Sequence, residues 1–319
     1  MHAASRLSRR LATTLLLLLH SLLMAGCTAY PLGLDETPAA IDTRRLEAAT
    51  YTPKSWPEPL QADVHLPVTA NDTSLRPAAL VVHGGGWQRR ERADMDAIAE
   101  RLAQRGYVAI NIDYRFAPTY RFPAQLHDLQ QAMHWINDQA ESWRIDTDRI
   151  IGVGYSSGAH LISLLAVMNS DNPLDSPFGG PDTRLAGVLA GGTPTDLLRF
   201  DDGRLLTDFI GGTQAEYPDR YRQASPLHQL GDSAPPFFLF HGNLDGLVPI
   251  EQAEVFHAAL NDRGIANTLY RLTLRGHYTT FLTAGPAIET GLDFLDRQLA
   301  PPPITAQSAS GIMAIPPNR

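Results

Sequence analysis

Short apolar runs alternate with longer segments of mixed polarity from about residue 60 to residue 300. Apolar runs that end at glycine or polar turns are typical of buried strands, and the mixed segments have the spacing of helices that cover a sheet. The expected strands are residues 78–82, 107–112, 149–155, 184–190, 237–241 and 268–272. The expected helices are residues 94–104, 125–140, 157–168, 251–260 and 286–299. This alternation predicts an α/β fold, with a mostly parallel sheet and helices on both of its faces.

Three segments depart from the alternation. Residues 27–60 are rich in Pro, Thr and Ala with little periodicity, so we expect a tether and an irregular lead-in to one domain over residues 61–300. Residues 196–235 are polar and contain Gly and Pro, which predicts a small lid or a long loop inside that domain. The Pro- and Ser-rich residues 301–319 are expected to form a disordered tail.

The first 26 residues have the composition of an export signal. Arg6, Arg9 and Arg10 precede an apolar run from Leu11 to Gly26. This run is short for a membrane span, which needs roughly 20 apolar residues. A basic start, an apolar middle and small residues at the end are typical of a secretory signal. We therefore expect residues 1–26 to be a signal peptide and the protein to be exported.

The end of this signal carries a second motif. Leu23-Met24-Ala25-Gly26-Cys27 resembles the lipobox of bacterial lipoproteins, in which the cysteine is lipidated and becomes the new N-terminus. Cys27 is the only cysteine, so it cannot form an internal disulfide. The resemblance implies membrane association through a lipid anchor on Cys27, and Thr28 after it implies the outer membrane or the periplasmic side of the envelope. The alternative is a conventional signal that is cut near Ala29.

Composition and charge exclude several classes of partner. The formal net charge is -8, and the Lys and Arg residues are scattered, so no basic stripe is expected to attract nucleic acid. The sequence contains no H-E-x-x-H motif and no cluster of Cys and His, so no metal is implied. Neither a metal nor any other cofactor is therefore expected.

The strongest chemical signal is Gly154-Tyr155-Ser156-Ser157-Gly158, a G-x-S-x-G motif between an expected strand and an expected helix. A nucleophilic serine on a sharp turn requires this setting, because the glycines leave room for the neighbouring strand and helix. Ser156 is the candidate nucleophile. Ser157 lies off-centre between the glycines, and its backbone N–H is a better candidate oxyanion donor. A dinucleotide loop at Gly152-Val153-Gly154 is rejected, since the third glycine comes one residue late for G-x-G-x-x-G.

A second motif, His83-Gly84-Gly85-Gly86-Trp87, directly follows the expected strand at residues 78–82. Consecutive glycines let backbone N–H groups approach a developing oxyanion, and each such donor is worth about 3 kcal/mol in the transition state. Gly84 and Gly85 are the candidate donors beside Ser157, and the alternative is an ordinary glycine-rich turn. Trp87 is expected to line an acyl or alcohol pocket.

These motifs resemble those of the α/β-hydrolases, in particular the hormone-sensitive-lipase-like and related bacterial esterase branches, which include feruloyl-esterase-like and kynurenine-formamidase-like members. The segments Asp113-Tyr114-Arg115-Phe116-Ala117-Pro118 and Phe122-Pro123-Ala124 are similar to that branch's D-Y-R-L-A-P and F-P-A stretches. The resemblance covers about residues 60–300. It implies an α/β-hydrolase domain that cleaves carboxylic esters, short-chain or aryl, through an acyl-enzyme. Arg115 and Asp128 are expected to form a structural ion pair.

A serine hydroxyl needs a base, and in this fold the acid and then the base follow the serine along the chain. His277, next to Gly276 after the last expected strand, resembles the base position of the family. Residues 241–249 resemble the family's H-G-x-x-D-x-x-V-P segment, in which the aspartate is the acid, so Asp245 is the candidate. Asp196, which follows an earlier strand, is the alternative acid.

Two other functions stay open at this point. Residues 241–249 are also similar to the prolyl-oligopeptidase-like hydrolases, so an amidase or peptidase of the same fold is one alternative, although those enzymes usually carry a propeller for which this chain has no room. The other alternative is a surface lipoprotein whose hydrolase fold serves binding alone. The presence of Ser156, Asp245 and His277 argues against the second alternative.

Overall fold

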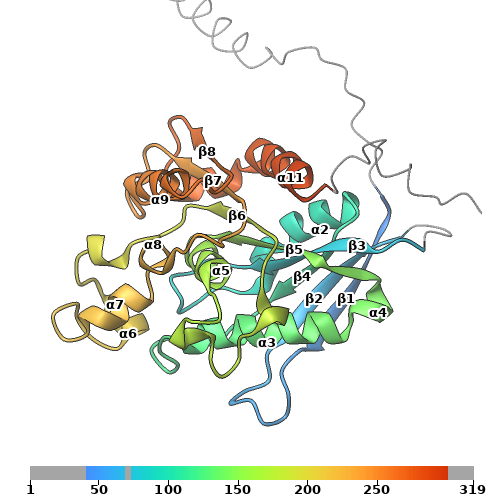
Figure 1. The fold of residues 1–319 in the computed structure, drawn as a ribbon, viewed down its shortest axis with the longest axis horizontal. Helices are drawn as coiled ribbons and strands as arrows, with labels where there is room; N and C mark the ends of the chain where they lie inside the picture. The colour runs from blue at the N-terminus through green and yellow to red at the C-terminus, as the bar shows by residue number, and fades with distance from the viewer. Residues whose placement is uncertain (1–40, 69–72, 301–319) are drawn as a thin grey trace, which may run out of the picture. The chain divides into compact units, whose positions relative to one another are not determined.

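The computed structural model describes residues 41–68 and 73–300 (Figure 1). Within that part of the chain, eight strands form one sheet. The strands are β1 (Thr43–Thr50), β2 (Gln61–Pro67), β3 (Arg76–Val82), β4 (Val108–Ile112), β5 (Ile145–Tyr155), β6 (Gly187–Gly191), β7 (Phe237–Gly242) and β8 (Asn267–Leu272). Their order across the sheet is β1-β2-β4-β3-β5-β6-β7-β8. The pairs that involve β2 are antiparallel, and all pairs from β4 to β8 are parallel.

Helices cover both faces of this sheet (Figure 1). The α-helices are α2 (Asp96–Gln104), α3 (Ala124–Asp138), α4 (Ala140–Trp143), α5 (Ser157–Val167), α6 (Arg204–Ile210), α7 (Pro218–Gln223), α8 (Pro226–Gln229), α9 (Glu251–Asp262), α10 (His277–Leu282) and α11 (Gly285–Leu299). The 3-10 helices are η1 (Arg92–Met95), η2 (Pro173–Asp175), η3 (Pro181–Thr183) and η4 (Leu197–Arg199). The prediction of a mostly parallel sheet between two layers of helices is confirmed.

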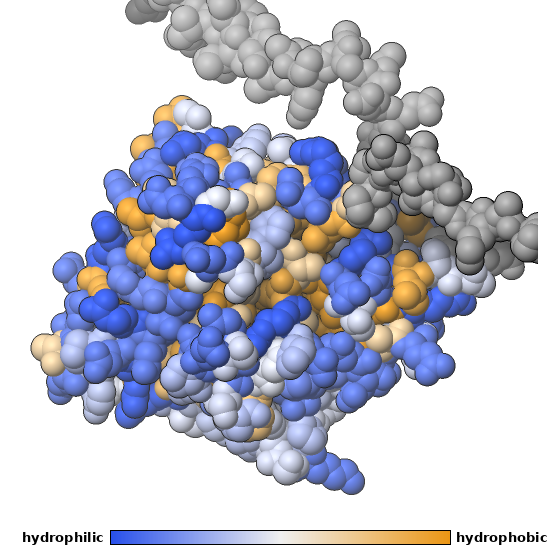
Figure 2. Space-filling view, in the orientation of Figure 1, coloured by the Kyte–Doolittle hydropathy of each residue, from blue (hydrophilic) through white to orange (hydrophobic). Residues whose placement is uncertain are grey.

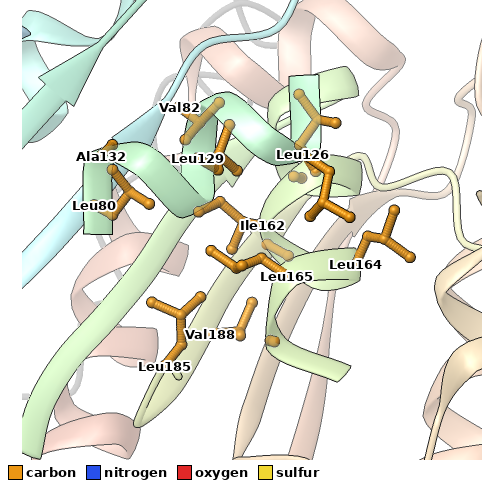
Figure 3. Close-up of a cluster of buried hydrophobic side chains, with 14 of the residues drawn as sticks. Leu80, Val82, Leu126, Leu129, Ala132, Ile162, Leu164, Leu165, Leu185 and Val188 are labelled. Carbon is orange, nitrogen blue, oxygen red and sulfur yellow. The ribbon is translucent and has the colours of Figure 1, made fainter. Parts of the chain in front are cut away.

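The alternating side chains of β3 show how the core is divided. Leu80 and Val82 belong to a buried cluster that includes residues of α3 and α5 (Figure 3), whereas Ala79 and Val81 belong to a second cluster with residues of α2 and α11. Successive side chains of a strand point to opposite faces of the sheet, so a strand covered on both faces must be apolar at consecutive positions. On the face drawn in Figure 2, hydrophilic residues predominate and hydrophobic ones lie in patches between them.

The expectation of an irregular lead-in over residues 27–60 is wrong for residues 43–50, which form β1 and pair with β2. β1 is the edge of the sheet, and its sequence TRRLEAAT is mostly exposed. An edge strand that buries few side chains shows no apolar run that sequence patterning can detect. The ordered domain therefore begins before residue 61.

Residues 196–235, expected as a small lid or a long loop, contain η4, α6, α7 and α8. Phe209 and Tyr221 in this insertion are fully buried, which is typical of a packed layer and not of a long loop. None of the helices in residues 41–68 and 73–300 has the length and apolar character of a membrane span. The expected signal peptide, Cys27 and the tail over 301–319 lie outside the described residues.

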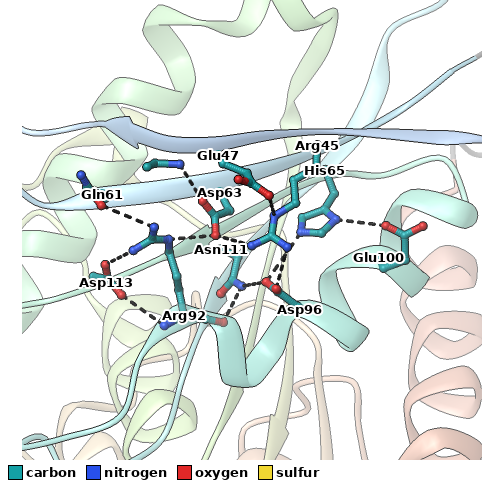
Figure 4. Close-up of polar contacts among 11 residues, drawn as sticks. Arg45, Glu47, Gln61, Asp63, His65, Arg92, Asp96, Glu100, Asn111 and Asp113 are labelled. Carbon is teal, nitrogen blue, oxygen red and sulfur yellow. Dashed lines mark hydrogen bonds and ion pairs between the residues drawn. The ribbon is translucent and has the colours of Figure 1, made fainter.

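A network of charged side chains joins β1 and β2 to the start of α2 (Figure 4). Asp63 on β2 lies 2.7 Å from the Arg45 guanidinium of β1 and 2.9 Å from the Arg92 guanidinium of η1. Arg92 also pairs with Asp113 at the end of β4. Because η1 follows the glycine-rich segment after β3, this network fixes the far end of that segment to the edge of the sheet.

The expected ion pair between Arg115 and Asp128 is present and buried. The Asp128 carboxylate accepts hydrogen bonds from the Arg115 side chain, from the Arg115 backbone N–H at 2.9 Å and from the Trp56 indole at 2.8 Å. Breaking a buried pair by removing one partner leaves an uncompensated charge, so these contacts are structural constraints on the segment after β4.

Candidate active site

Ser156 occupies the turn between β5 and α5, at the carboxyl end of the parallel strands. Its backbone has φ 55° and ψ −124°, a conformation that non-glycine residues rarely adopt and that a nucleophile elbow requires. A Cβ at Gly154 would lie 2.6 Å from the Gly158 carbonyl carbon, and one at Gly158 would lie 2.2 Å from the Val82 carbonyl oxygen. Both glycines are therefore required for the turn to pack against the sheet.

The structure brings Ser156, His277 and Asp245 together from three separate strand ends. His277 Nε2 lies 2.9 Å from Ser156 Oγ, and His277 Nδ1 lies 2.7 Å from Asp245 Oδ2. An ionised carboxylate can only accept, so Nδ1–H donates to Asp245 and Nε2 accepts the Ser156 hydroxyl proton. The Tyr155 hydroxyl donates to the His277 carbonyl oxygen at 2.5 Å, which holds the start of α10 against the elbow.

Asp245 lies in the turn after β7 and is nearly buried. Its Oδ1 accepts the backbone N–H groups of Leu247 and Val248, each at 2.9 Å, and its Oδ2 lies 3.5 Å from His241 Nε2. Burial alone raises the pKa of Asp245, but the hydrogen bonds from His241, His277 and the backbone outweigh it and hold the pKa well below its usual range. The carboxylate is therefore ionised at neutral pH.

Asp196, the alternative acid, lies in another environment. Its Oδ1 accepts the Leu198 backbone N–H at 3.1 Å and lies 3.0 Å from His228 Nε2, and its Oδ2 pairs with Arg199 at 3.0 Å. These contacts cap η4 and join it to α8. The structure does not bring Asp196 to His277, whose Nδ1 is bonded to Asp245.

The three candidate oxyanion donors belong to residues that line one cavity together with Ser156. A Cβ at Gly84 would lie 3.0 Å from the Tyr155 carbonyl oxygen and 3.2 Å from Ser156 Cβ, so the glycine-rich segment contacts the elbow directly. Gly85 has φ 120°, and a Cβ there would lie 2.0 Å from the Arg89 carbonyl oxygen. Ser157 is the first residue of α5, where a backbone N–H has no intrahelical acceptor. Its N–H is thus free to bind a ligand.

A cavity of about 800 Å³ opens at Ser156 and is lined by the glycine-rich segment, the insertion and α10. A volume of this size is in the range of small-molecule sites. Trp87 is part of its wall, as expected. In residues 41–68 and 73–300, the structure contains no group of three or more His, Cys, Asp or Glu side chains that could hold a metal ion.

Contacts of Trp87 attach the insertion to the glycine-rich segment. The Trp87 ring stacks on Phe209 of α6 at 4.4 Å between centroids, and its indole N–H donates to His160 Nδ1 at 3.2 Å. His160 Nε2 in turn donates to the Ala224 carbonyl oxygen at 2.7 Å. His160 and Phe209 were not predicted from the sequence. The one available signal was a histidine inside the mostly apolar α5.

The burial of His160 makes stability depend on pH. Burial lowers the pKa of His160 to about 4 from 6.5, although the hydrogen bond to Ala224 opposes this shift. Between these values the unfolded chain binds a proton that the folded chain does not, so the free energy of unfolding falls as the pH falls. We expect His160 to account for a loss of about 2 kcal/mol between pH 7.5 and pH 5.

Guanidinium denaturation at the two pH values measures this loss. His160→Gln keeps a hydrogen-bond donor and an acceptor but does not titrate. Between pH 7.5 and pH 5, the free energy of unfolding of the variant should therefore fall by about 2 kcal/mol less than that of the wild type. Equal losses in the two proteins would contradict the assignment of this pH dependence to His160.

The parallel sheet, the strained serine turn after β5 and the hydrogen-bonded Ser156, His277 and Asp245 are the features that define an α/β-hydrolase. The sequence matches the BD-FAE family over residues 62–260, which is more than half of the chain. The protein belongs to this family. The expected membership of the α/β-hydrolase esterases is confirmed.

Two mycobacterial proteins are similar in sequence. Esterase LipQ of Mycobacterium tuberculosis is 29% identical over 215 residues, which cover 65% of this chain and 51% of LipQ. Esterase LipC of the same organism is 32% identical over 195 residues, which cover 58% of this chain and 48% of LipC. The chain thus spans about half the length of these curated relatives.

Two solved structures are similar in fold. A truncated carbohydrate esterase from gut microbiota has a TM-score of 0.71 at 21% identity, over 82% of this chain and 98% of that chain. Est2, an esterase of Thermogutta terrifontis, has a TM-score of 0.67 at 23% identity, over 82% of this chain and 93% of that chain. Both likenesses support the predicted α/β-hydrolase fold.

Proposed function

We propose that this protein is a carboxylic ester hydrolase with Ser156 as its nucleophile. The observation that carries the proposal is the continuous hydrogen-bonded chain from Ser156 Oγ through His277 to Asp245, with distances of 2.9 and 2.7 Å. Ser156, the first residue of this series of hydrogen bonds, occupies a strained turn and lines a cavity, where an ester carbonyl can reach it. Two relatives, LipQ and LipC, are named esterases, which supports the same reaction.

In the proposed mechanism, Ser156 Oγ attacks the ester carbonyl carbon while His277 Nε2 takes the hydroxyl proton. Asp245 stabilises the resulting imidazolium. The backbone N–H groups of Gly84, Gly85 and Ser157 hold the oxyanion. The tetrahedral intermediate then collapses, the carbon–oxygen bond to the alcohol breaks, and His277 gives its proton to the leaving oxygen.

The acyl group is now bound to Ser156 as an ester. A water molecule attacks this acyl-enzyme with His277 as base, the same donors hold the second oxyanion, and collapse releases the carboxylic acid. Ser156 regains its proton from His277. Every proton transfer in the cycle passes through His277. The substrates that we propose are short-chain or aryl esters.

A pair of matched substrates separates esterase from amidase activity. We expect kcat/KM for p-nitrophenyl butyrate to exceed that for butyryl p-nitroanilide by at least about a thousandfold, or about 4 kcal/mol of transition-state free energy. The anilide is cleaved more slowly because its leaving nitrogen must be protonated as it departs. Comparable values for the two substrates would favour the amidase alternative, and inertness toward both would favour a binding protein.

We also propose that residues 1–26 direct export and that Cys27 carries a lipid anchor on the outer membrane or the periplasmic side of the envelope. The support is the lipobox-like segment that ends at Cys27, the only cysteine of the chain. The full chain expressed in a bacterium fed with labelled palmitate should incorporate label, and Cys27→Ala should incorporate none. Label in the variant, or a mature N-terminus near Ala29 in the wild type, would contradict the anchor.

A further inference from the structure

Three large apolar side chains are exposed at the mouth of the cavity that contains Ser156. Leu247 is 48% exposed, Tyr278 is 62% exposed and Leu282 is 78% exposed, and all three line the cavity. A single exposed leucine is ordinary, but a group of apolar side chains around one cavity marks a contact surface. We call these three residues the apolar rim.

The apolar rim is built on the segments that position the base and the acid. His277 and Tyr278 are consecutive in α10, their rings meet edge to face at 5.8 Å between centroids, and Leu282 lies one helical turn further on. Leu247 belongs to the turn after β7, where its backbone N–H donates to Asp245. The rim therefore flanks His277, whereas Gly84, Gly85 and Ser157 belong to other segments.

The charged side chains of the cavity wall are distributed unevenly. They belong to the segment after β3 and to the insertion, and they are Arg89, Arg90, Asp94, Asp201 and Arg204. The part of the wall formed by α10 and the turn after β7 contributes Phe281 and Val248 beside the rim. Phe281 packs on the Tyr155 ring at 4.9 Å, so the apolar surface extends from the rim into the cavity.

The proton route indicates which half of an ester lies on this side. His277 Nε2 gives its proton to the leaving alcohol oxygen, so that oxygen must lie within hydrogen-bond distance of Nε2 when the intermediate collapses. The carbonyl oxygen is held at the glycine-rich segment and Ser157. The alcohol half of the substrate therefore extends from the reacting carbon toward His277 and lies beside Tyr278.

We propose that the apolar rim binds the alcohol half of the ester and that this half is an apolar alkyl or aryl group; this inference rests on the proposed esterase function. Among the residues of α10 and the turn after β7 that line the cavity, a sugar or another alcohol rich in hydroxyl groups would meet the Tyr278 hydroxyl and the His277 imidazole, but no carboxylate, guanidinium or amide side chain. An alkyl or aryl group would cover the exposed side chains of the rim and remove their apolar surface from water.

Three esters test the proposal. Hexyl acetate and ethyl hexanoate are isomers, and each adds four methylene groups to ethyl acetate, on the alcohol half and on the acyl half respectively. We expect kcat/KM for hexyl acetate to exceed that for ethyl acetate by about thirtyfold, and ethyl hexanoate to gain less than about fivefold. Because ethyl acetate and hexyl acetate form the same acetyl-enzyme, the difference between them reports on the alcohol alone. Acid release is followed by titration at constant pH.

Variants of the rim complete the test. In the double variant Leu247→Asn and Leu282→Asn, the ratio of kcat/KM for hexyl acetate to kcat/KM for ethyl acetate should fall about tenfold. The matched control is Leu75→Asn, which removes a 60% exposed leucine next to the opposite end of β3 and should leave the ratio unchanged. A wild-type ratio near one, an unchanged ratio in the double variant, or a gain confined to ethyl hexanoate would overturn the proposal. In each of those cases ethyl acetate is still hydrolysed, whereas failure of the proposed function would leave all three esters intact.

Discussion

Ser156→Ala is expected to lower kcat for p-nitrophenyl acetate by about six orders of magnitude. Without the hydroxyl no acyl-enzyme can form, and only the oxyanion donors and substrate binding remain to accelerate attack by water. Ser156 is partly accessible at the cavity and its side chain fills no core position, so unfolding by guanidinium should be unchanged. The measurement is the steady-state rate of purified wild type and variant under the same conditions.

The matched control for this experiment is Ser163→Ala. Ser163 is a buried serine on α5, the helix that follows Ser156, and its hydroxyl has no hydrogen-bond partner among the described residues. This variant should retain activity within about threefold, since it touches neither the cavity nor the proposed triad. Activity of Ser156→Ala within about tenfold of wild type would exclude Ser156 as the nucleophile.

Asp245→Asn is expected to lower kcat by about four orders of magnitude. The carboxylate accepts the Nδ1–H of His277 at 2.7 Å and so leaves Nε2 free to accept the Ser156 proton. An asparagine can present its own N–H groups to Nδ1, which favours the tautomer with the proton on Nε2. That tautomer cannot act as a base toward Ser156, although the geometry of the site is nearly unchanged.

Asp196→Asn is the control that separates the two candidate acids. Asp196 pairs with Arg199 and His228, so its substitution should change kcat by less than about tenfold. A large loss in this variant together with a small loss in Asp245→Asn would reverse the assignment of the acid.

The strands from β3 to β7 could be predicted because each contains an apolar run, and burial on both faces of a parallel sheet requires such runs. β2 could not be predicted in this way. Asp63 and His65 are buried in β2 although they are polar, because they lie in the ion-pair network with Arg45, Arg92 and Glu100. Only the folded chain provides these partners. In the sequence, β2 is a short alternation of apolar and polar residues, which is typical of a strand with one face in water, and not the apolar run of a strand that is buried on both faces.

The candidate site likewise has residues that could be predicted from the sequence and contacts that could not. Ser156, Asp245 and His277 lie in short motifs that follow strands, and the topology of the fold brings these motifs together at the carboxyl end of the parallel strands. The attachment of the insertion depends on contacts between distant positions, such as Trp87 with His160, 73 residues apart, and His160 with Ala224, 64 residues apart. No local pattern encodes such pairs.

The proposed role of Ser156 is tested most directly by reaction with a fluorophosphonate followed by mass spectrometry of the proteolytic peptides. One phosphonyl adduct is expected on Ser156, formed rapidly in wild type and far more slowly in Asp245→Asn, because attack on phosphorus needs the same activated hydroxyl. The neighbouring Ser157, on the same peptide, should remain unmodified. An unreacted protein, or an adduct on Ser157 with Ser156 intact, would contradict the assignment of Ser156 as the nucleophile.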